Sequence, residues 1–166
     1  LMEFCEGQLD ENGFLVGREN DWIYIDWADM DKDGPLCAEQ MLYAACFRVM
    51  AEISEQLGKD GNVYRQEYEK LTAAIEKFFW DEEKGAYIDS FTSGKRNVTR
   101  HANIFAILFD IADKQKQEKI LTNVLENDEI PAITTPYFNF FELDVLCQMG
   151  KLTEVLDKIR SYWGGM

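Results

Sequence analysis

The sequence has few of the residues that carry metal and redox chemistry. His101 is the single histidine among 166 residues, which excludes a histidine-rich zinc site. The four cysteines, Cys5, Cys37, Cys46 and Cys147, form no C-x-x-C pair and have no metal-ligand spacing. Cys37 and Cys46 fall on one predicted helix, about 13 Å apart along its axis, which is too far for a disulfide. We therefore interpret all four as small buried residues of a reduced protein, and we expect no cofactor and no metal.

The sequence also has no excess of basic residues and no long apolar run. The 17 Lys and Arg residues against 31 Asp and Glu residues give a formal net charge of −14. Such a surface repels phosphate backbones, so we expect no nucleic-acid partner. No stretch approaches the roughly 20 apolar residues that a membrane span needs, so we expect no membrane partner. Aromatic residues are plentiful at 13%, and an acidic surface with many aromatic rings suits a neutral polar ligand such as a sugar.

The 3.6-residue period of apolar residues predicts helices at about 37–57, 63–80, 101–112, 115–126, 136–149 and 152–163. The first, third and fifth are apolar nearly all round, so each must be covered on several sides. The second, fourth and sixth carry one apolar stripe opposite Lys and Glu. This alternation of inner and outer helices predicts an all-α, two-layered toroid built from helical hairpins.

The alternative architecture is a solenoid of helix pairs, which would repeat at one fixed period. The inner helices instead begin near residues 37, 101 and 137, at spacings of about 65 and 36. The long first interval contains residues 85–90, a predicted strand of a surface hairpin that ends at the turn Ser93-Gly94. Residues 22–27 are also strand-like and follow a turn at 10–14. Unequal loops of this kind argue against a solenoid.

A polar loop precedes each predicted inner helix, at residues 21–34, 97–103 and 133–137. The inner helices of a toroid run parallel, so these loops share one rim, where helix N-termini leave free N–H donors. Asp26 and Trp27 suit a sugar there, because a carboxylate accepts from hydroxyls while a ring stacks on an apolar sugar face. His101 starts an inner helix, where it could contact a ligand at the rim.

Each of these candidates has a structural alternative. Trp27 could pack in the core while Asp33 caps the first inner helix, and His101 could be a hydrogen-bonded structural residue. Glu142 lies among apolar neighbours, so it is either a desolvated acid catalyst or a structural carboxylate with a partner. Glu39 and Gln40, in the first turn of an apolar helix, carry the same two interpretations.

The aspartates of the first loop allow one metal alternative. Asp29, Asp31 and Asp33 alternate as at the start of a calcium loop, but no Glu follows at the required offset.

Several segments together resemble the middle of bacterial α-L-rhamnosidase catalytic domains. The resemblance covers nearly the whole chain in order, which makes it more specific than any single motif. It is carried by Asp21-Trp22-Ile23-Tyr24-Ile25-Asp26-Trp27-Ala28-Asp29, Cys37-Ala38-Glu39-Gln40-Met41, Gly85-x-Tyr87-x-Asp89, Arg100-His101-Ala102-Asn103, Thr134-Thr135-Pro136-Tyr137-Phe138 and Tyr162-Trp163-Gly164-Gly165-Met166.

The resemblance implies that residues 1–166 are one partial catalytic domain. Its fold would be three helical hairpins forming about half of an (α/α)6 barrel of the six-hairpin glycosidase type, with short β-hairpins in the loops. Its activity would be inverting hydrolysis of terminal α-L-rhamnosides from glycans or glycosides. The family's general acid lies upstream of the first segment and its general base just downstream of the last, so no catalytic residue is expected here. Sugar-binding roles carry over to Asp26 and Trp27, and also to Trp22, His101 and Tyr137.

Both ends look like cuts, because Leu1–Cys5 resembles the last turn of a helix and Tyr162–Met166 an unfinished apolar segment. Half a barrel leaves inner helices bare, so the expected partners are a carbohydrate and the remainder of the parent barrel, with self-association if isolated. We expect the isolated piece to be inactive. Another six-hairpin glycosidase and a non-catalytic helical interaction module stay as alternatives. The bacterial compartment, cytoplasm or periplasm, is left open.

Overall fold

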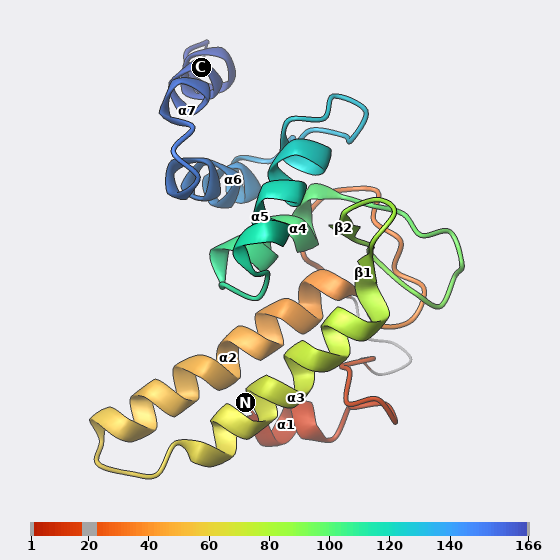
Figure 1. The fold of residues 1–166 in the computed structure, drawn as a ribbon, viewed down its shortest axis with the longest axis vertical. Coiled ribbons are helices and arrows are strands. Elements are labelled where there is room, and N and C mark those ends of the chain that lie inside the picture. Colours follow the sequence, from red (N-terminus) through yellow and green to blue (C-terminus); the bar gives the residue numbers. More distant parts are fainter. Residues whose placement is uncertain (1, 18–22, 166) are drawn as a thin grey trace.

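The computed structural model describes residues 2–17 and 23–165, and helices dominate it (Figure 1). The helices and strands are α1 (Met2–Glu6), α2 (Cys37–Gln56), α3 (Asn62–Phe79), β1 (Trp80–Asp81), β2 (Ala86–Tyr87), α4 (Arg100–Leu108), α5 (Lys114–Ile120), α6 (Pro136–Gln148) and α7 (Leu152–Lys158). Two π-helical turns extend α5 and α7, at Leu121–Leu125 and Ile159–Trp163.

Three helical hairpins follow one another along the described chain, in agreement with the prediction. α2 pairs with α3, α4 with α5 and its π-helical turn, and α6 with α7. The first helices of the hairpins also pack in series, α2 against α4 and α4 against α6. Figure 1 shows α2 and α3 side by side at one end of the molecule and α7 at the other. The prediction of a mostly helical fold with inner and outer helices is therefore confirmed.

The core is centred on α4, the middle inner helix. Every residue from Arg100 to Ile107 is buried, so this helix is covered on all sides. α3 instead buries one stripe, Leu71, Ile75 and Phe79, as its apolar spacing predicts. Each fully buried side chain of this size contributes about 1.5–3 kcal/mol, so the inner helices are held chiefly by apolar burial.

Several predicted boundaries differ from the structure. The third predicted helix, 101–112, ends at Leu108 because the backbone reverses at Asp110, whose φ is +52°. The hairpin of β1 and β2 is antiparallel, with Trp80 opposite Tyr87. It was expected at the surface, but Ala86 and Tyr87 are buried against the inner helices. The strand predicted at 22–27 is absent from its described part, residues 23–27, which form an irregular loop.

One prediction and one of the open alternatives about side chains are wrong. Cys147 is exposed on α6, and Cys5 and Cys46 are half-buried, so only Cys37 is the buried residue that we expected of all four. Asp33 does not cap α2, because the residue at the N-cap position is Leu36 and no side chain caps the helix.

Large apolar side chains remain uncovered on two of the inner helices. They are Leu42, Val49 and Ile53 on α2 and Tyr137 and Phe140 on α6, each more than 40% exposed. The outer helix α7 adds Leu152 and Leu156. In the described ranges, no helix combines the length and apolar character that crossing a membrane would need.

Candidate functional site

Loops that precede α2, α4 and α6 meet at one pocket. Its volume is about 230 Å³, below the roughly 300–1,000 Å³ of sites for drug-sized ligands, so it suits a ligand of monosaccharide size. The pocket is lined by Asp26, Trp27, Ala28, Asp29, Thr99, His101 and residues 131–134.

Asp26 connects the three loops. Its side chain is only 2% exposed. Oδ2 lies 3.0 Å from Nε2 of His101, the second residue of α4, and Oδ1 accepts a 2.7 Å hydrogen bond from Thr135 Oγ1. Thr135 also caps α6, because its Oγ1 accepts from the backbone N–H of Phe138 at 3.3 Å. The carboxylate is therefore held by the first turns of two inner helices.

Aromatic rings stand exposed beside this carboxylate. Trp27 is 69% exposed, which contradicts the alternative in which it packs in the core. Its ring meets that of Tyr24 edge to face, with centroids 5.4 Å apart. The pKa of Tyr24 is raised by desolvation and by the charges of Asp26 and Tyr137. The side chains of Tyr24, Asp26 and Tyr137 therefore lie near one another. A carboxylate acceptor next to exposed rings can bind hydroxyls while a ring covers an apolar face.

His101 joins the pocket to the core. Its ring packs on Phe138 with centroids 4.4 Å apart, and its side chain is 3% exposed. Burial lowers the pKa of the imidazole, and the hydrogen bond to Asp26 opposes this effect. The residue is both a structural histidine and part of the pocket lining.

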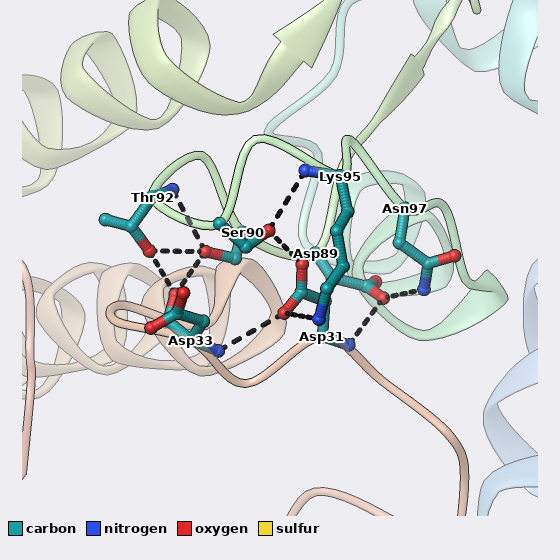
Figure 2. Close-up of polar contacts among 8 residues, drawn as sticks. Asp31, Asp33, Asp89, Ser90, Thr92, Lys95 and Asn97 are labelled. Atoms are coloured by element: carbon teal, nitrogen blue, oxygen red, sulfur yellow. Dashed lines mark hydrogen bonds and ion pairs between the residues drawn. The ribbon is translucent and has the colours of Figure 1, made fainter.

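A second polar cluster reaches the pocket at Thr99, and part of it is drawn in Figure 2. Its centre is Asp89, which follows β2. Asp89 Oδ2 accepts from the backbone N–H of Asp31 at 3.2 Å and from Asn97 Nδ2 at 2.7 Å. Asp89 Oδ1 lies 2.7 Å from Thr99 Oγ1. Burial raises the pKa of Asp89.

The outer edge of this cluster fixes Asp31. Its carboxylate accepts from the hydroxyl of Ser93 and lies 3.6 Å from Lys95 Nζ. Figure 2 shows the Lys95 side chain directed at Asp31. The hydrogen bond from Ser93 is the main cause that lowers the pKa of Asp31. Asp31 is therefore engaged by protein groups, and within residues 2–17 and 23–165 no group of three or more Asp, Glu, His or Cys side chains is arranged to hold a metal ion.

The comparisons with known proteins decide the family. The sequence matches the bacterial alpha-L-rhamnosidase 6 hairpin glycosidase domain over residues 3–133. The chain belongs to this rhamnosidase family. A search of curated proteins found no match.

Two solved structures are similar to this rhamnosidase-family chain. A rhamnosidase from Klebsiella oxytoca with rhamnose bound shares 26% identity, with a TM-score of 0.80. A GH78 family rhamnosidase of Bacillus sp. GL1 shares 23% identity with a TM-score of 0.85, a likeness that shows the fold. Each comparison covers 99% of this chain, but only 31% of the Klebsiella protein and 18% of the Bacillus protein. The chain thus spans less than a third of either relative's length.

The structure brings together some of the residues that the rhamnosidase resemblance selects. Asp26, Trp27 and His101 line one pocket. Tyr137 is 60% exposed in the first turn of α6 and stands near Tyr24, outside the lining of that pocket. Trp22 lies outside the described residues.

Sequence reasoning missed Tyr24, Thr99 and Thr135. Tyr24 is within the aromatic run that drew attention to Trp27, so the run itself was a signal for it. Thr99 and Thr135 both sit directly before an inner helix, where a threonine is expected to cap the helix. Only Thr135 does so, and that expectation hid the bonds of the two residues to Asp89 and Asp26.

Glu142 has partners on both sides. Its side chain is 1% exposed, and it accepts from Arg100 Nη1 and from Lys158 Nζ, each at 2.6 Å. Of the two interpretations of this residue, the structural carboxylate with a partner therefore has the geometric support.

Proposed function

We propose that this chain supplies the sugar-binding rim of an inverting α-L-rhamnosidase that hydrolyses terminal α-L-rhamnosides from glycans or glycosides. The observation that supports this most is the pairing of the buried acceptor Asp26 with the exposed ring of Trp27 at one pocket. Membership of the rhamnosidase family and the rhamnose bound to the Klebsiella relative indicate the sugar.

Each rim residue has a proposed role. Asp26 accepts hydrogen bonds from sugar hydroxyls with the lone pairs that His101 and Thr135 leave free, because a carboxylate offers about four acceptor positions. Trp27 stacks on an apolar face of the ring. His101 orients Asp26, and Tyr137 extends the aromatic rim. Trp22 is also proposed to bind the sugar. No cofactor is needed for this chemistry.

The catalytic pair is proposed to lie outside these 166 residues. Inversion needs two carboxyl groups about 6.5–9.5 Å apart, one as the general acid and one as the general base for water. We place the acid upstream of this chain and the base downstream. The remainder of the parent barrel then covers the apolar faces at Leu42, Val49 and Phe140, and the isolated chain self-associates and is inactive.

Calorimetric titration of the longer protein that carries this chain with L-rhamnose tests the binding site. Trp27→Ala and Asp26→Asn are expected to weaken L-rhamnose binding by about tenfold or more, which is ~1.4 kcal/mol or more. Leu57→Ala removes a side chain that is equally exposed, at 67%, but lies at the far end of α2, and should leave binding unchanged. Equal affinity of all four proteins for L-rhamnose would contradict the site.

A further inference from the structure

Four buried polar side chains form a continuous chain from the end of β2 to the sugar pocket. Asp89 Oδ1 lies 2.7 Å from Thr99 Oγ1, Thr99 Oγ1 lies 3.3 Å from His101 Nδ1, and His101 Nε2 lies 3.0 Å from Asp26 Oδ2. Thr99, the most exposed of the four, is only 8% exposed. Buried polar groups have to satisfy their hydrogen bonds inside the protein, so the three contacts must share the protons that the chain itself holds.

The proton count decides how the contacts are made. A hydroxyl carries one proton, so Thr99 cannot donate to both of its neighbours. If the imidazole is neutral and both carboxylates are ionised, the three contacts share two protons, one from the Thr99 hydroxyl and one from the imidazole. One contact would then join two acceptors with no proton between them. A third proton removes this conflict.

If the third proton is on Asp89, only one of the two carboxyl oxygens can carry it. Oδ2 of Asp89 already accepts from the backbone N–H of Asp31 and from Asn97, so the proton belongs on Oδ1, facing Thr99. Burial favours the neutral form of both titratable groups, because it raises the pKa of Asp89 and lowers the pKa of His101.

We propose that Asp89 is a positioning residue for the sugar site, which through Thr99 holds neutral His101 with its proton on Nε2, directed at Asp26. Asp89 donates from Oδ1 to Thr99 Oγ1, Thr99 donates to His101 Nδ1, and His101 Nε2–H donates to Asp26. Asp26 then accepts from His101 and from Thr135, and its remaining lone pairs face the pocket. This inference rests on the proposed function, because it assigns the state of the carboxylate that receives the sugar.

Other charged groups around the chain are balanced. His101 is faced by Asp26, Asp89 and Glu142, and Arg100 and Lys158 neutralise Glu142. Asp89 is faced by the buried thiol of Cys37 and by the peptide of Asp31. Among the described residues, Asp89 forms no ion pair with Lys or Arg, and the nearby Lys95 pairs with Asp31 instead. The proton on Asp89 therefore relieves a carboxylate that has no salt-bridge partner.

The single histidine makes the test direct. In the longer protein that carries this chain, segmental labelling of residues 1–166 with 15N-histidine assigns both labelled imidazole nitrogen signals to His101. At neutral pH we expect a proton on Nε2 and none on Nδ1. A neutral imidazole protonated on Nδ1, or a doubly protonated imidazole at neutral pH, would overturn the proposal.

Two near-isosteric variants separate this role from a merely structural one, with the imidazole pKa as the readout. Asp89→Asn should leave the imidazole pKa unchanged, because Asp89 is already neutral and the amide can direct its NH2 group only at Thr99. Thr99→Val should raise the imidazole pKa by about one unit, because the donor that favours the neutral ring is lost. If Asp89 were ionised, it would take the Thr99 proton and leave Thr99 Oγ1 as an acceptor for Nδ1–H. Asp89→Asn and Thr99→Val would then both lower the imidazole pKa.

Ser93→Ala is the matched control, because Ser93 bonds to Asp31 in the same cluster but outside the chain. It should not change the imidazole signals. Addition of L-rhamnose distinguishes the two proposals. Failure to bind L-rhamnose while the imidazole results hold would contradict the proposed function alone, and a wrong tautomer with normal L-rhamnose binding would contradict the role of Asp89 alone.

Discussion

Asp26 and His101 are 75 residues apart in the sequence, yet Oδ2 of one lies 3.0 Å from Nε2 of the other. This contact ties the irregular loop before α2 to the first turn of the central helix α4. The loop has no regular secondary structure of its own in residues 23–35, so side-chain bonds of this kind hold it in place.

Removing the Asp26 carboxylate should therefore destabilise the fold as well as the site. In Asp26→Ala the buried Nε2–H of His101 and the hydroxyl of Thr135 lose their acceptor, which should lower the free energy of unfolding by about 2 kcal/mol. Asp29→Ala, an exposed carboxylate of the same loop, should change it by less than about 0.5 kcal/mol. Urea denaturation measures both, and equal losses would contradict the anchoring role of Asp26.

The Glu142 ion pairs predict a larger loss. Glu142→Ala leaves Arg100, which is 5% exposed, with an uncompensated charge, and should cost about 3 kcal/mol. Glu154→Ala breaks an exposed contact with Lys151 at 3.8 Å and should cost less than about 0.5 kcal/mol. Thermal unfolding measures both variants. Equal falls in melting temperature would contradict a buried ion pair at Glu142.

Two glycines with the same backbone conformation separate steric crowding from strain. Gly34 and Gly94 have φ of +73° and +72°. A Cβ on Gly34 would lie 2.5 Å from Thr92 Oγ1, whereas one on Gly94 meets nothing within 4 Å. Gly94→Ala should cost about 1 kcal/mol from backbone strain alone, and Gly34→Ala about 3 kcal/mol because the Thr92 side chain is short and cannot move aside. Equal costs in urea denaturation would show that Gly34 is not packed against Thr92.

The pH dependence of the free energy of unfolding should reveal the raised pKa of Glu39. Burial raises its pKa from 4.5 to about 7, and among the described residues Oε2 has no hydrogen-bond partner. The folded state binds this proton more tightly than the unfolded chain does, so the contribution is complete below about pH 4.5 and is lost as the pH rises through about 7.

Relative to Glu39→Gln, the wild-type free energy of unfolding should fall by about 1 kcal/mol between pH 5 and pH 8, a value reduced for solvent screening. Urea denaturation across this range measures the difference. Parallel pH profiles for the two proteins would contradict a raised pKa at Glu39.

The sequence predicted the three hairpins because apolar periodicity reports burial directly, and α4, which is apolar nearly all round after its first turn, is the clearest case. The same periodicity could not locate Asp110, where a backbone reversal ends α4 early, or the π-helical turns at Leu121 and Ile159. Residues 23–27 alternate like a strand, yet among the described residues β1 and β2 pair only with each other, and residues 23–27 form a loop.

The candidate site was predicted less completely than the fold. Asp26, Trp27 and His101 were found because charged and aromatic residues stand out in short loops. Their relation to Thr99 and Thr135 depends on contacts between loops that are far apart in the sequence, which no local pattern contains. The proposal of rhamnose as the sugar comes from the resemblance to rhamnosidases. The chemistry of the residues alone indicates only a neutral polar ligand.

Hydrolysis of nitrophenyl α-L-rhamnoside tests the central claim most directly. The protein that carries this chain together with its flanking segments should cleave it and release β-L-rhamnose first, as inversion requires, while the 166-residue chain alone should not cleave it. Trp27→Ala in the longer protein should lower kcat/KM by about tenfold or more. Cleavage of a different glycoside with no action on the α-L-rhamnoside would contradict the account.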